Sequence, residues 1–580
     1  MLISRKAKES IKTALAITIA YGIALKMGWD KPMWAGFAVA FVSLETIGQS
    51  FNKAALRMFG TLVAVAVSLA FIGFFAQDRW LFMLFLAAWV GYCTYMMGGG
   101  KHQYFWHVCG FVSIIICMGA GPDSVNAFTV AMLRTQETGL GILVYSLISL
   151  FLWPSSSRSD FNTAASKLAS TQHQLYQAYL GQMKNKDSGG ETQTLRTQMV
   201  KEQTRFNQLL DAAEIDTYEV WERRQQWRQY QRQSADFTET MEGWYENFSE
   251  LKLLDLQSLL PNLTTFGAEL DKRFTQIERM LAGQAPEHQP TTIDLALDEA
   301  RVRSLSNFHR AALTVTRTRM LHLEALTQSL FDAACDFRDL GRIVDIPAAP
   351  RPQTGFVLDP DRLISVVRVM TTLWLAYLAL IYVPDLPGGA GFVSMGGPFA
   401  MVLATNPQLP VAKLIAPVTV GVLFGSVIYI FIMPQLASFI GLGLLIFSAT
   451  FVICYLYADP KRMLSRLFGL AMFISLTAIS NEQTYSFLSV ATTALMFVLL
   501  FLLLAITSNI PFSARPELAF LRLLGRYFRS CEYLMFTMHR DPHRKKTCLE
   551  RWKKTFYTYE LSSLPSKLGG WARFINSKSL

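Results

Sequence analysis

Cysteine and charged residues are both scarce in this chain. Of its 580 residues, 7 are cysteine and 17% are charged, whereas soluble globular domains carry about 25% charged residues. The cysteines show no CxxC pairing, and four of them (Cys93, Cys109, Cys117 and Cys454) lie within apolar runs. These features exclude a disulfide scaffold, argue against a zinc site, and indicate that each cysteine is a small buried apolar residue.

Motifs for nucleotide-driven or hydrolytic chemistry are also absent. The sequence contains no GxxxxGKS or GxxxxGKT, no HExxH and no GxSxG, so neither ATP hydrolysis nor hydrolase chemistry has local support. We therefore expect a protein that is not an enzyme and that uses no cofactor and no metal. Any energy for its function would come from an ion gradient or from a partner.

The chain is rich in apolar residues. Apolar residues make up 51% of it, and the mean hydropathy is +0.26, so part of the chain must meet a solvent other than water. The 41 Phe, 23 Met and 12 Trp also exclude a disordered or collagen-like polymer, because disorder follows from too little apolar surface.

The apolar residues are gathered into segments long enough to cross a bilayer. A spanning helix needs about 20 mostly apolar residues, and the chain offers two blocks of six such segments with about 200 polar residues between them. The first segment follows a basic stretch but has no cleavage site, so it is interpreted as a span and not as a secretory signal. The predicted spans are about 11–28, 32–50, 56–76, 79–98, 103–121 and 133–153, then 363–383, 389–408, 412–433, 436–457, 463–480 and 487–508.

Lysine and arginine fall mostly on one side of these spans. The other side has only Lys26, Lys31 and Arg79 in the first block, with Arg134 ambiguous, and its second-block turns have no Lys or Arg. By the positive-inside rule, both termini and the long central segment are cytoplasmic. The residues on the basic side are Arg5, Lys6, Lys8, Lys12, Lys53, Arg57, Lys101, Arg158, Arg362, Arg368, Lys413, Lys461, Arg462 and Arg466.

The two blocks are related by a shift of 356 residues. This shift moves Lys12 onto Arg368 and Arg57 onto Lys413, and it aligns the last three spans of each block. Because six is an even number, the two blocks share one orientation, and we expect a parallel duplication about an axis near the membrane normal. The alternative, a chance match of evenly sized helices, stays open because few residues are identical. The predicted domains are a first six-helix transmembrane repeat (1–154), a cytoplasmic helical domain (155–360), a second six-helix transmembrane repeat (361–511) and a basic cytoplasmic tail (512–580). The predicted fold class is therefore all-α.

The central segment carries one narrow apolar seam. Its residues step alternately by 3 and 4, which predicts a coiled-coil hairpin punctuated by loops at 187–190 and 286–290, with a linker at 347–352. Aromatic residues on such a seam are far more often core than ligand-binding. The seam comprises Trp227, Tyr230, Ser234, Phe237, Met241, Trp244, Phe248 and Leu251.

The tail is strongly basic. From Arg515 onward its net charge is +9, out of +11 for the whole chain. Next to a membrane, each such charge attracts anionic lipid by roughly 1 kcal/mol. The rival interpretation, nucleic-acid binding, lacks a recognition motif, so we expect anionic lipids and no nucleic acid as partners of the tail.

Four ionisable residues inside the predicted spans are candidates for function, because a charge in hydrocarbon is costly unless it is paired or hydrated. Glu45 lies late in the second span, Arg57 opens the third, and Arg134 and Glu137 open the sixth. Arg57 or Arg134 could bind a substrate carboxylate with a bidentate fork, while Glu45 or Glu137 could load and unload a proton. The alternative is that Arg134 and Glu137, three residues apart, neutralise each other and anchor a helix end.

Two further features have competing interpretations. His102 and His107 flank Trp106 but are five apart and lack other ligands, so an interfacial or satisfied histidine is favoured over a metal site. The 384–391 and 396–398 segments, rich in Gly and Pro, are interpreted as interruptions of the eighth span. Broken helices expose backbone to substrate in transporters; an ordinary outer turn followed by a kink is the alternative.

Taken together, Arg57-x-x-Gly60-Thr61 and Arg134-x-x-Glu137-Thr138-x-x-Gly141, set in a layout of six spans, a helical domain and six spans, resemble the fusaric acid resistance family of aromatic acid exporters. The segment 209–214, ahead of the seam, is also similar to the central domain of that family. Two departures are evident. The second block has Lys413 for the arginine and Thr493 where Glu137 would fall, which makes any site asymmetric, and the tail is short for the family.

The resemblance implies an exporter of small aromatic or hydrophobic organic acids in the bacterial inner membrane. It also implies a periplasmic membrane-fusion adaptor and an outer-membrane channel as partners, while self-association into a homo-oligomer is left open. We expect the transport to be coupled to protons. Two alternatives from other classes remain: a passive organic-anion channel, and a scaffold that moves no solute and recruits a partner to the membrane.

Overall fold

The computed structural model describes residues 4–43, 47–99, 102–120, 124–153, 157–183, 189–246, 256–336, 358–405, 411–459, 462–483, 485–513, 515–538, 547–572 and 574–575. All the regular structure in these residues is helical. The chain divides into two compact units. The first, called the membrane unit below, consists of residues 1–43, 53–153 and 351–580, and the second, called the polar unit, consists of residues 44–52 and 154–350.

The membrane unit contains the apolar helices. Seven helices in the described part of the chain are long and apolar enough to cross a membrane by length and composition: Ala54–Phe75, Arg79–Met97, Gln103–Ala120, Pro360–Tyr382, Leu414–Gln435, Phe439–Leu456 and Phe487–Thr507. Three more apolar helices are shorter, at Met33–Val42, Ala390–Ala404 and Ser465–Thr477. The prediction of an apolar, all-α membrane protein is therefore confirmed, while the layout with twelve spans remains a prediction.

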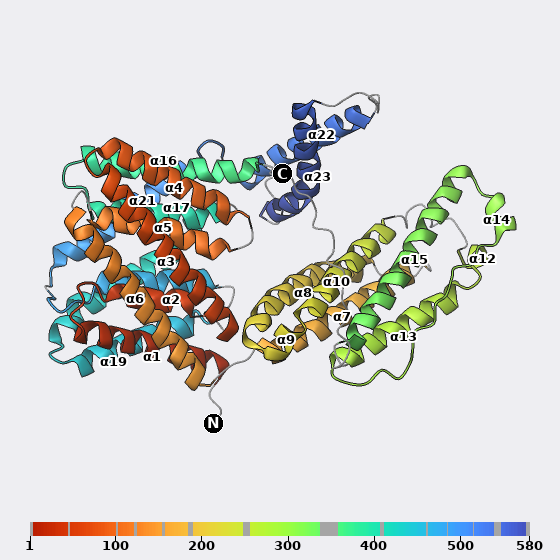
Figure 1. Ribbon diagram of the computed structural model, residues 1–580, viewed down its shortest axis with the longest axis horizontal. Coiled ribbons are helices and arrows are strands. Elements are labelled where there is room, and N and C mark those ends of the chain that lie inside the picture. The colour runs from red at the N-terminus through yellow and green to blue at the C-terminus, as the bar shows by residue number, and fades with distance from the viewer. Residues whose placement is uncertain are drawn as a thin grey trace. The chain divides into compact units, whose positions relative to one another are not determined.

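The helices of the membrane unit fall into two successive sets (Figure 1). The first set is α1 (Arg5–Lys26), α2 (Met33–Val42), α3 (Ile47–Phe75), α4 (Arg79–Met97), α5 (Gln103–Ala120) and α6 (Ser124–Phe151). The second set is α16 (Pro360–Tyr382), α17 (Ala390–Thr405), α18 (Ala412–Val427) with the short helices η1 (Ile428–Ile432) and η2 (Met433–Gln435), α19 (Phe439–Leu456), α20 (Met463–Thr477) and α21 (Phe487–Thr507).

Several predicted boundaries were wrong. α2 ends at Val42, well before residue 50. The apolar span in α3, Ala54–Phe75, agrees with the predicted span 56–76, although the helix itself already begins at Ile47. α6 likewise begins at Ser124 instead of 133. Arg57 and Arg134 consequently do not open their helices, because each lies ten residues after the first residue of its helix. The first turns of α3 and α6 contain polar residues, which form helix although they lie outside the apolar segments that were used to predict the spans.

The predicted interruption at 396–398 was also wrong. α17 runs without a break from Ala390 to Thr405 with Pro398 inside it. The turn before α17 carries the unusual backbone instead, with positive φ at Asp385, Gly388 and Gly389. Proline removes only one helical hydrogen bond, and neighbouring helices can compensate for that loss. The outer turn of the alternative interpretation is therefore present, and Pro398 lies inside the helix that follows it.

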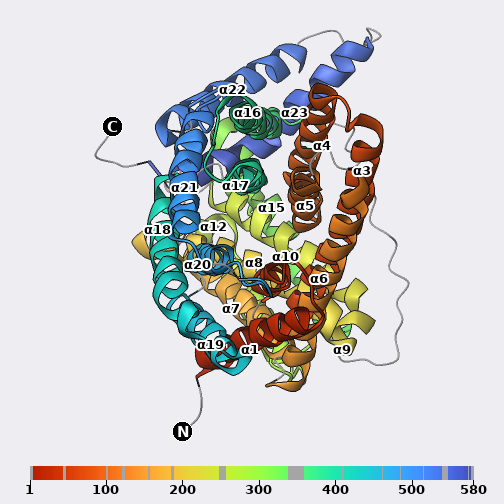
Figure 2. The same cartoon turned by 90° about the vertical axis from the view of Figure 1, so that its left-hand side faces the viewer.

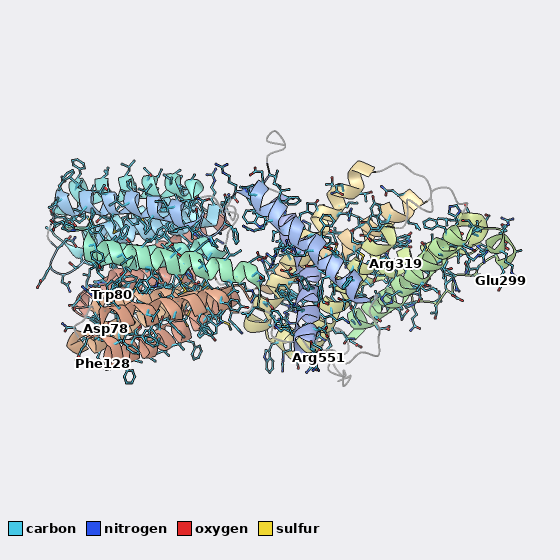
Figure 3. All side chains as sticks on the ribbon, turned by 90° about the horizontal axis from the view of Figure 1, so that it is seen from above. Asp78, Trp80, Phe128, Glu299, Arg319 and Arg551 are labelled. Carbon is cyan, nitrogen blue, oxygen red and sulfur yellow. The ribbon has the colours of Figure 1, made fainter. Side chains whose placement is uncertain are left out.

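Helices of the first set pack against helices of the second. α1 contacts α19, α16 contacts α4, α2 contacts α20, and α5 contacts α17. Figures 1 and 2 both show α1 beside α19, and Figure 2 shows α5, α17 and α20 toward the middle of the unit. In Figure 3, Asp78 and Trp80 at the α3–α4 turn lie at the same end of the unit as Phe128 near the start of α6.

Small residues let the α5 and α17 backbones approach closely. A Cβ atom added to Gly110 would lie 2.4 Å from the methyl carbon of Met401, and one added to Gly397 would lie 2.4 Å from Cδ1 of Ile114. Each glycine therefore receives a large side chain from the opposite helix, which is how small residues promote helix association in lipid. A further link joins the sets, because Arg466 of α20 donates to the carbonyl oxygen of Ser43 (2.8 Å), directly after α2 ends.

The polar unit is a bundle with its own core. Its helices are α7 (Ser157–Met183), α8 (Gly189–Asp216), α9 (Tyr218–Glu222), α10 (Arg224–Tyr245), α12 (Leu256–Leu259), α13 (Leu263–Leu281), α14 (Glu299–Arg303) and α15 (Asn307–Asp336). α10 packs against α15, α8 and α7, while α7 also packs against α8 and α13. The predicted seam is buried on α10 at Trp227, Tyr230, Ser234, Phe237, Met241 and Trp244. Phe248 and Leu251 lie outside the described residues.

The tail forms two helices that pack on each other, α22 (Pro516–Met538) and α23 (Cys548–Ala572). Ala519 and Leu523 of α22 meet Leu564 and Trp571 of α23 in a small apolar core. Ionic contacts attach this pair to the start of α16, since Lys567 reaches Asp361 at 2.7 Å and Arg526 reaches the same carboxyl group at 2.7 Å.

Candidate functional site

A row of aromatic rings follows one face of α2. Trp34, Phe37 and Phe41 are spaced by 3 and 4 residues, which places them on the same side of a helix. The ring centroids of Trp34 and Phe37 are 5.0 Å apart, and those of Phe37 and Phe41 are 6.5 Å apart. Phe111 of α5 extends the row, 6.3 Å from Phe41. These four rings are called the aromatic ladder below.

Arg57 lies at one end of the aromatic ladder. Its side chain is 2% exposed, and its Cζ atom lies 5.1 Å from the ring centroid of Phe41 and 5.6 Å from that of Phe111. Its Nη1 donates a hydrogen bond to the hydroxyl of Tyr104 at 3.0 Å, whereas its Nε is buried with no hydrogen-bond partner. Attraction to the faces of the rings is thus a main compensation for burying this charge.

Arg134 lies at the other end. Its Cζ atom is 3.5 Å from the ring centroid of Trp34. Glu137 follows on the same face of α6, and its carboxyl oxygen Oε2 is 3.9 Å from Nη1 of Arg134. That distance is too long for a hydrogen bond, and both Nη1 of Arg134 and Oε1 of Glu137 are buried with no hydrogen-bond partner. The two groups are paired in charge, but one nitrogen of the guanidinium and one oxygen of the carboxylate have no hydrogen-bond partner.

Glycine holds each arginine against the ladder. A Cβ atom added to Gly60, one turn after Arg57, would lie 2.9 Å from Cβ of Val108 in α5. A Cβ atom added to Gly141 would lie 2.4 Å from the backbone oxygen of Ala35 in α2. Only glycine allows these approaches, since a Cβ at that position would displace backbone. The glycines of the two short motifs therefore set the distance between each arginine helix and its aromatic neighbours.

The ladder forms one wall of a cavity between the two helix sets. The cavity has a volume of about 110 Å³ and takes its lining from α2, α5, α17 and α20. It is smaller than the roughly 300 Å³ of typical small-molecule pockets, so an aromatic ligand would have to push the lining side chains apart. The lining residues are Trp34, Phe37, Phe41, His107, Phe111, Ile115, Ser394, Met395, Pro398, Phe399, Val402, Leu467, Phe468, Ala471, Met472 and Ser475.

Pro398 gives this apolar cavity a polar element. In an α-helix the N–H of residue i bonds to the carbonyl of residue i−4, and proline has no N–H to donate. The carbonyl of Ser394 therefore lacks its helical donor, and both Ser394 and Pro398 line the cavity. A hydroxyl or a protonated carboxyl group on a ligand could donate to this carbonyl.

The predicted site residues are only partly described. Glu45 lies outside the described residues, as does the side chain of Lys413. Arg57 and Arg134 do not contact each other, but the aromatic ladder connects them. His107 lines the cavity and its ring lies 5.3 Å from that of Phe111, whereas His102 is exposed before α5 begins. No group of three or more His, Cys, Asp or Glu arranged to hold a metal occurs among the described residues.

The ladder itself was missed by sequence reasoning. The spacing of Trp34, Phe37 and Phe41 was visible, but aromatic residues inside an apolar segment signal only membrane burial. The available signal was a helical face of three rings in a chain that also carries Arg57-x-x-Gly60 and Arg134-x-x-Glu137 inside apolar segments. With both arginines stacked on the rings, the site combines flat apolar surfaces with positive charge, which suits an aromatic anion.

Comparisons with known proteins give this geometry a context. The sequence profile of the fusaric acid resistance protein family matches residues 8–552. The chain is 29% identical over 161 residues to the uncharacterized transporter YdhK of Escherichia coli K12, covering 27% of this chain and 23% of YdhK. It is 25% identical over 179 residues to the p-hydroxybenzoic acid efflux pump subunit AaeB of the same strain, covering 29% of this chain and 27% of AaeB.

A third relative is the uncharacterized transporter GOX0755 of Gluconobacter oxydans, 30% identical over 148 residues that cover 24% of this chain and 20% of GOX0755. The chain thus spans about a quarter of the length of these curated relatives. The family match, by contrast, extends over nearly the whole sequence and includes both arginine motifs. The chain belongs to the fusaric acid resistance protein family.

Proposed function

We propose that this protein is an efflux transporter of the bacterial inner membrane for small aromatic or hydrophobic organic acids. The observation that carries the proposal is the aromatic ladder with an arginine stacked at each end, next to a cavity between the two helix sets. An aromatic carboxylate offers a ring for the ladder and a charge for Arg57 or Arg134. The printed name of AaeB supports the same class of substrate.

The proposed architecture is a pair of six-helix repeats. Under the shift of 356 residues, α1 corresponds to α16 and α4 to α19, so the contact of α1 with α19 corresponds to that of α16 with α4. The contact of α2 with α20 corresponds in the same way to that of α17 with α5. Chance similarity of helix lengths does not predict matched contacts, so this pairing supports a parallel duplication.

The remaining parts of the proposal follow from charge. Lys and Arg crowd one side of the spans, which supports cytoplasmic termini and a cytoplasmic polar unit. Glu137, or Glu45, is proposed to exchange a proton during transport, because Glu137 is 1% exposed and hydrogen-bonded incompletely. A periplasmic adaptor and an outer-membrane channel would complete export across both membranes, and anionic lipid would contact the exposed basic residues of the tail.

Flux into proteoliposomes tests the proposal. Purified protein should move p-hydroxybenzoate uphill when a proton gradient is imposed, and a protonophore should abolish that movement. Arg134→Gln should lower the rate about a hundredfold, an effect of about 2.7 kcal/mol on the transport barrier. Arg79→Gln is the matched control, since Arg79 also lies over a tryptophan ring, at 5.2 Å from that of Trp80, but is exposed.

The outcomes separate the alternatives. Downhill flux that persists when the proton gradient is collapsed, with no uphill flux, would favour a passive anion channel. Absence of organic-anion flux in either direction would favour a scaffold. Equal rates for wild type and Arg134→Gln would refute the role assigned to Arg134, and the same comparison applies to Arg57→Gln.

A further inference from the structure

A second cavity lies where the tail meets the membrane helices. Its volume is about 350 Å³, which falls within the range of small-molecule pockets. Membrane helices α4, α5, α16 and α17 form one side, and the tail contributes Arg522, Leu523, Lys567 and Trp571. It is called the tail cavity below.

The carboxylates of the tail cavity are already neutralised. Asp361 accepts from Lys567 at 2.7 Å and from Arg526 at 2.7 Å. Asp359 accepts from Lys567 at 2.9 Å and lies 3.6 Å from Arg362. These two carboxylates therefore share three cations, Lys567, Arg526 and Arg362, of which Arg526 also pairs with Glu560.

Two guanidinium groups lining the tail cavity lack a counter-ion. Arg368 donates to the backbone oxygens of Ile510 and Phe512, at 3.1 and 2.8 Å. Arg522 lies over the ring of Phe512 at 4.8 Å, and its Nε is buried with no hydrogen-bond partner. Among the described residues, no carboxylate lies within ion-pair distance of either group. Burial lowers the pKa of Arg522 and the nearby Arg526 adds to that effect although Asp361 opposes it, so an anion in the cavity would relieve an unfavourable charge.

The tail cavity and the aromatic cavity follow each other along the same two helices. Gln103 of α5 lines the tail cavity, and His107, one turn later, lines the aromatic cavity; four residues of α-helix rise by about 6 Å. In α17, Ala404 lines the tail cavity and Val402 the aromatic cavity. The linings of the two cavities thus come within about one helical turn of each other on both α5 and α17.

We propose that the tail cavity is the cytoplasmic loading site of the transporter, where Arg368 and Arg522 bind the carboxylate of an aromatic acid before its ring reaches the aromatic ladder. Trp571 and Leu523 supply apolar contacts for the ring. This proposal rests on the proposed function. It assigns to the tail a role in substrate binding that is separate from attraction to the lipid surface.

The test uses Arg522→Gln in the full chain, reconstituted in proteoliposomes, with p-hydroxybenzoate as the probe. A loading site acts on binding, so the KM should rise about tenfold while the maximal rate changes less than about twofold. Arg522→Lys, which keeps the charge but loses the fork, should give a smaller rise. Arg529→Gln is the matched control, since it removes the same charge from the same helix at an exposed position.

A chemical measurement avoids any dependence on variants. Phenylglyoxal modifies arginine, and mass spectrometry can follow the modification of each tail arginine in the wild-type protein. Saturating p-hydroxybenzoate should slow the modification of Arg522 at least about fivefold and leave that of Arg529 unchanged. In a second series, the rate of Arg522 modification is compared between liposomes made with and without phosphatidylglycerol.

Three results would overturn the proposal. Unchanged KM and unprotected Arg522, in a wild-type protein that does transport p-hydroxybenzoate, would leave the proposed function standing and remove the loading site. Protection of Arg522 by phosphatidylglycerol that p-hydroxybenzoate cannot displace would identify a lipid headgroup as the occupant. Wild-type protein that neither binds nor transports the probe would remove both proposals.

Discussion

Buried arginines in the two units differ in how completely their guanidinium groups are hydrogen-bonded. Arg273 of the polar unit is 1% exposed, and it donates to Glu269 (3.3 Å), to Glu324 (2.8 Å) and to the backbone oxygens of Thr291 (2.6 Å) and Glu324 (3.2 Å). Arg57 and Arg134 of the membrane unit are also buried but leave donors unused and face aromatic rings. A guanidinium whose donors all have partners within the protein has none left for a ligand, whereas an incompletely satisfied one retains that capacity.

The largest expected effect comes from a substitution that breaks the hydrogen-bonded network around Arg273. Arg273→Met leaves Glu269 and Glu324 without their buried cation, and removing one partner of such a network costs about 3–5 kcal/mol. Hydrogen exchange of the peptides that cover α13 and α15 should report local unfolding that is easier by about that amount. Arg57→Met is the comparison in the membrane unit, and its effect on exchange in α3 should stay below about 1.5 kcal/mol. Equal losses in the two units would contradict the distinction.

A second prediction tests whether packing positions Arg134. In Gly141→Ala the new methyl group would meet the backbone oxygen of Ala35 at 2.4 Å, so α6 must move away from α2 and carry Arg134 off the ring of Trp34. Overpacking of this kind costs about 1–3 kcal/mol, and p-hydroxybenzoate flux should fall about tenfold or more. Gly139→Ala is the control, because its Cβ would meet only the flexible end of Met58 at 3.9 Å. Similar flux in the two variants would argue against this role of Gly141.

A third prediction concerns pH and the polar unit alone. Burial by itself would lower the pKa of His173, but hydrogen bonds to Asp271 and Glu278 outweigh it and raise the pKa from 6.5 to about 9. The folded state therefore holds this proton more tightly than the unfolded chain. The resulting stabilisation, about 1–2 kcal/mol after discounting for partial exposure, is fully present below about pH 6.5 and is lost as the pH rises through about 9.

His173→Gln should remove that pH dependence. Hydrogen exchange in α7 and α13 of the full chain, measured between pH 6 and pH 10 and corrected for intrinsic rates, provides the readout. Wild-type protection that does not decline toward pH 10, relative to the variant, would exclude His173 as a stabilising cation.

The smallest expected effect concerns the ladder. Trp34→Leu keeps an apolar side chain but removes the ring under Arg134, and a partly desolvated cation–π contact contributes about 1 kcal/mol. Binding of p-hydroxybenzoate should weaken about fivefold, measured by equilibrium dialysis of the detergent-solubilised protein. Trp80→Leu, which alters an exposed tryptophan beside Arg79, should leave affinity unchanged. An unchanged affinity in Trp34→Leu would remove Trp34 from the site.

Much of the fold was accessible from composition and periodicity. Apolar segments predict membrane helices because hydrocarbon selects for them, and the 3-and-4 spacing of Trp227, Tyr230 and Ser234 predicts a buried face, as α10 has. Periodicity identifies the apolar face of a helix but not the helix that covers it. The contacts of α1 with α19 and of α5 with α17 join segments hundreds of residues apart, and no local pattern encodes them.

Only some residues of the candidate site could be recognised from the sequence, and whether they act in transport stays a prediction. Arg57, Arg134 and Glu137 stand out because charge is rare inside apolar segments. Trp34 and Phe41 do not stand out, since an aromatic residue in a span is ordinary until an arginine is seen to lie on it. The early end of α2 was equally hidden, because the group that binds the carbonyl of Ser43, directly after the helix, comes from Arg466, 423 residues later in the chain.

That bond between Arg466 and Ser43 has a mechanical consequence. A guanidinium donating to a carbonyl at the end of a helix is a charge-assisted bond, roughly twice as strong as a neutral one, and here it ties the last turn of α2 to α20. If the two helix sets rock against each other during a transport cycle, the Phe41 end of the aromatic ladder must either move with the second helix set or lose the hydrogen bond between Arg466 and Ser43. The bending would then occur within α2 and not at the interface between the two helix sets.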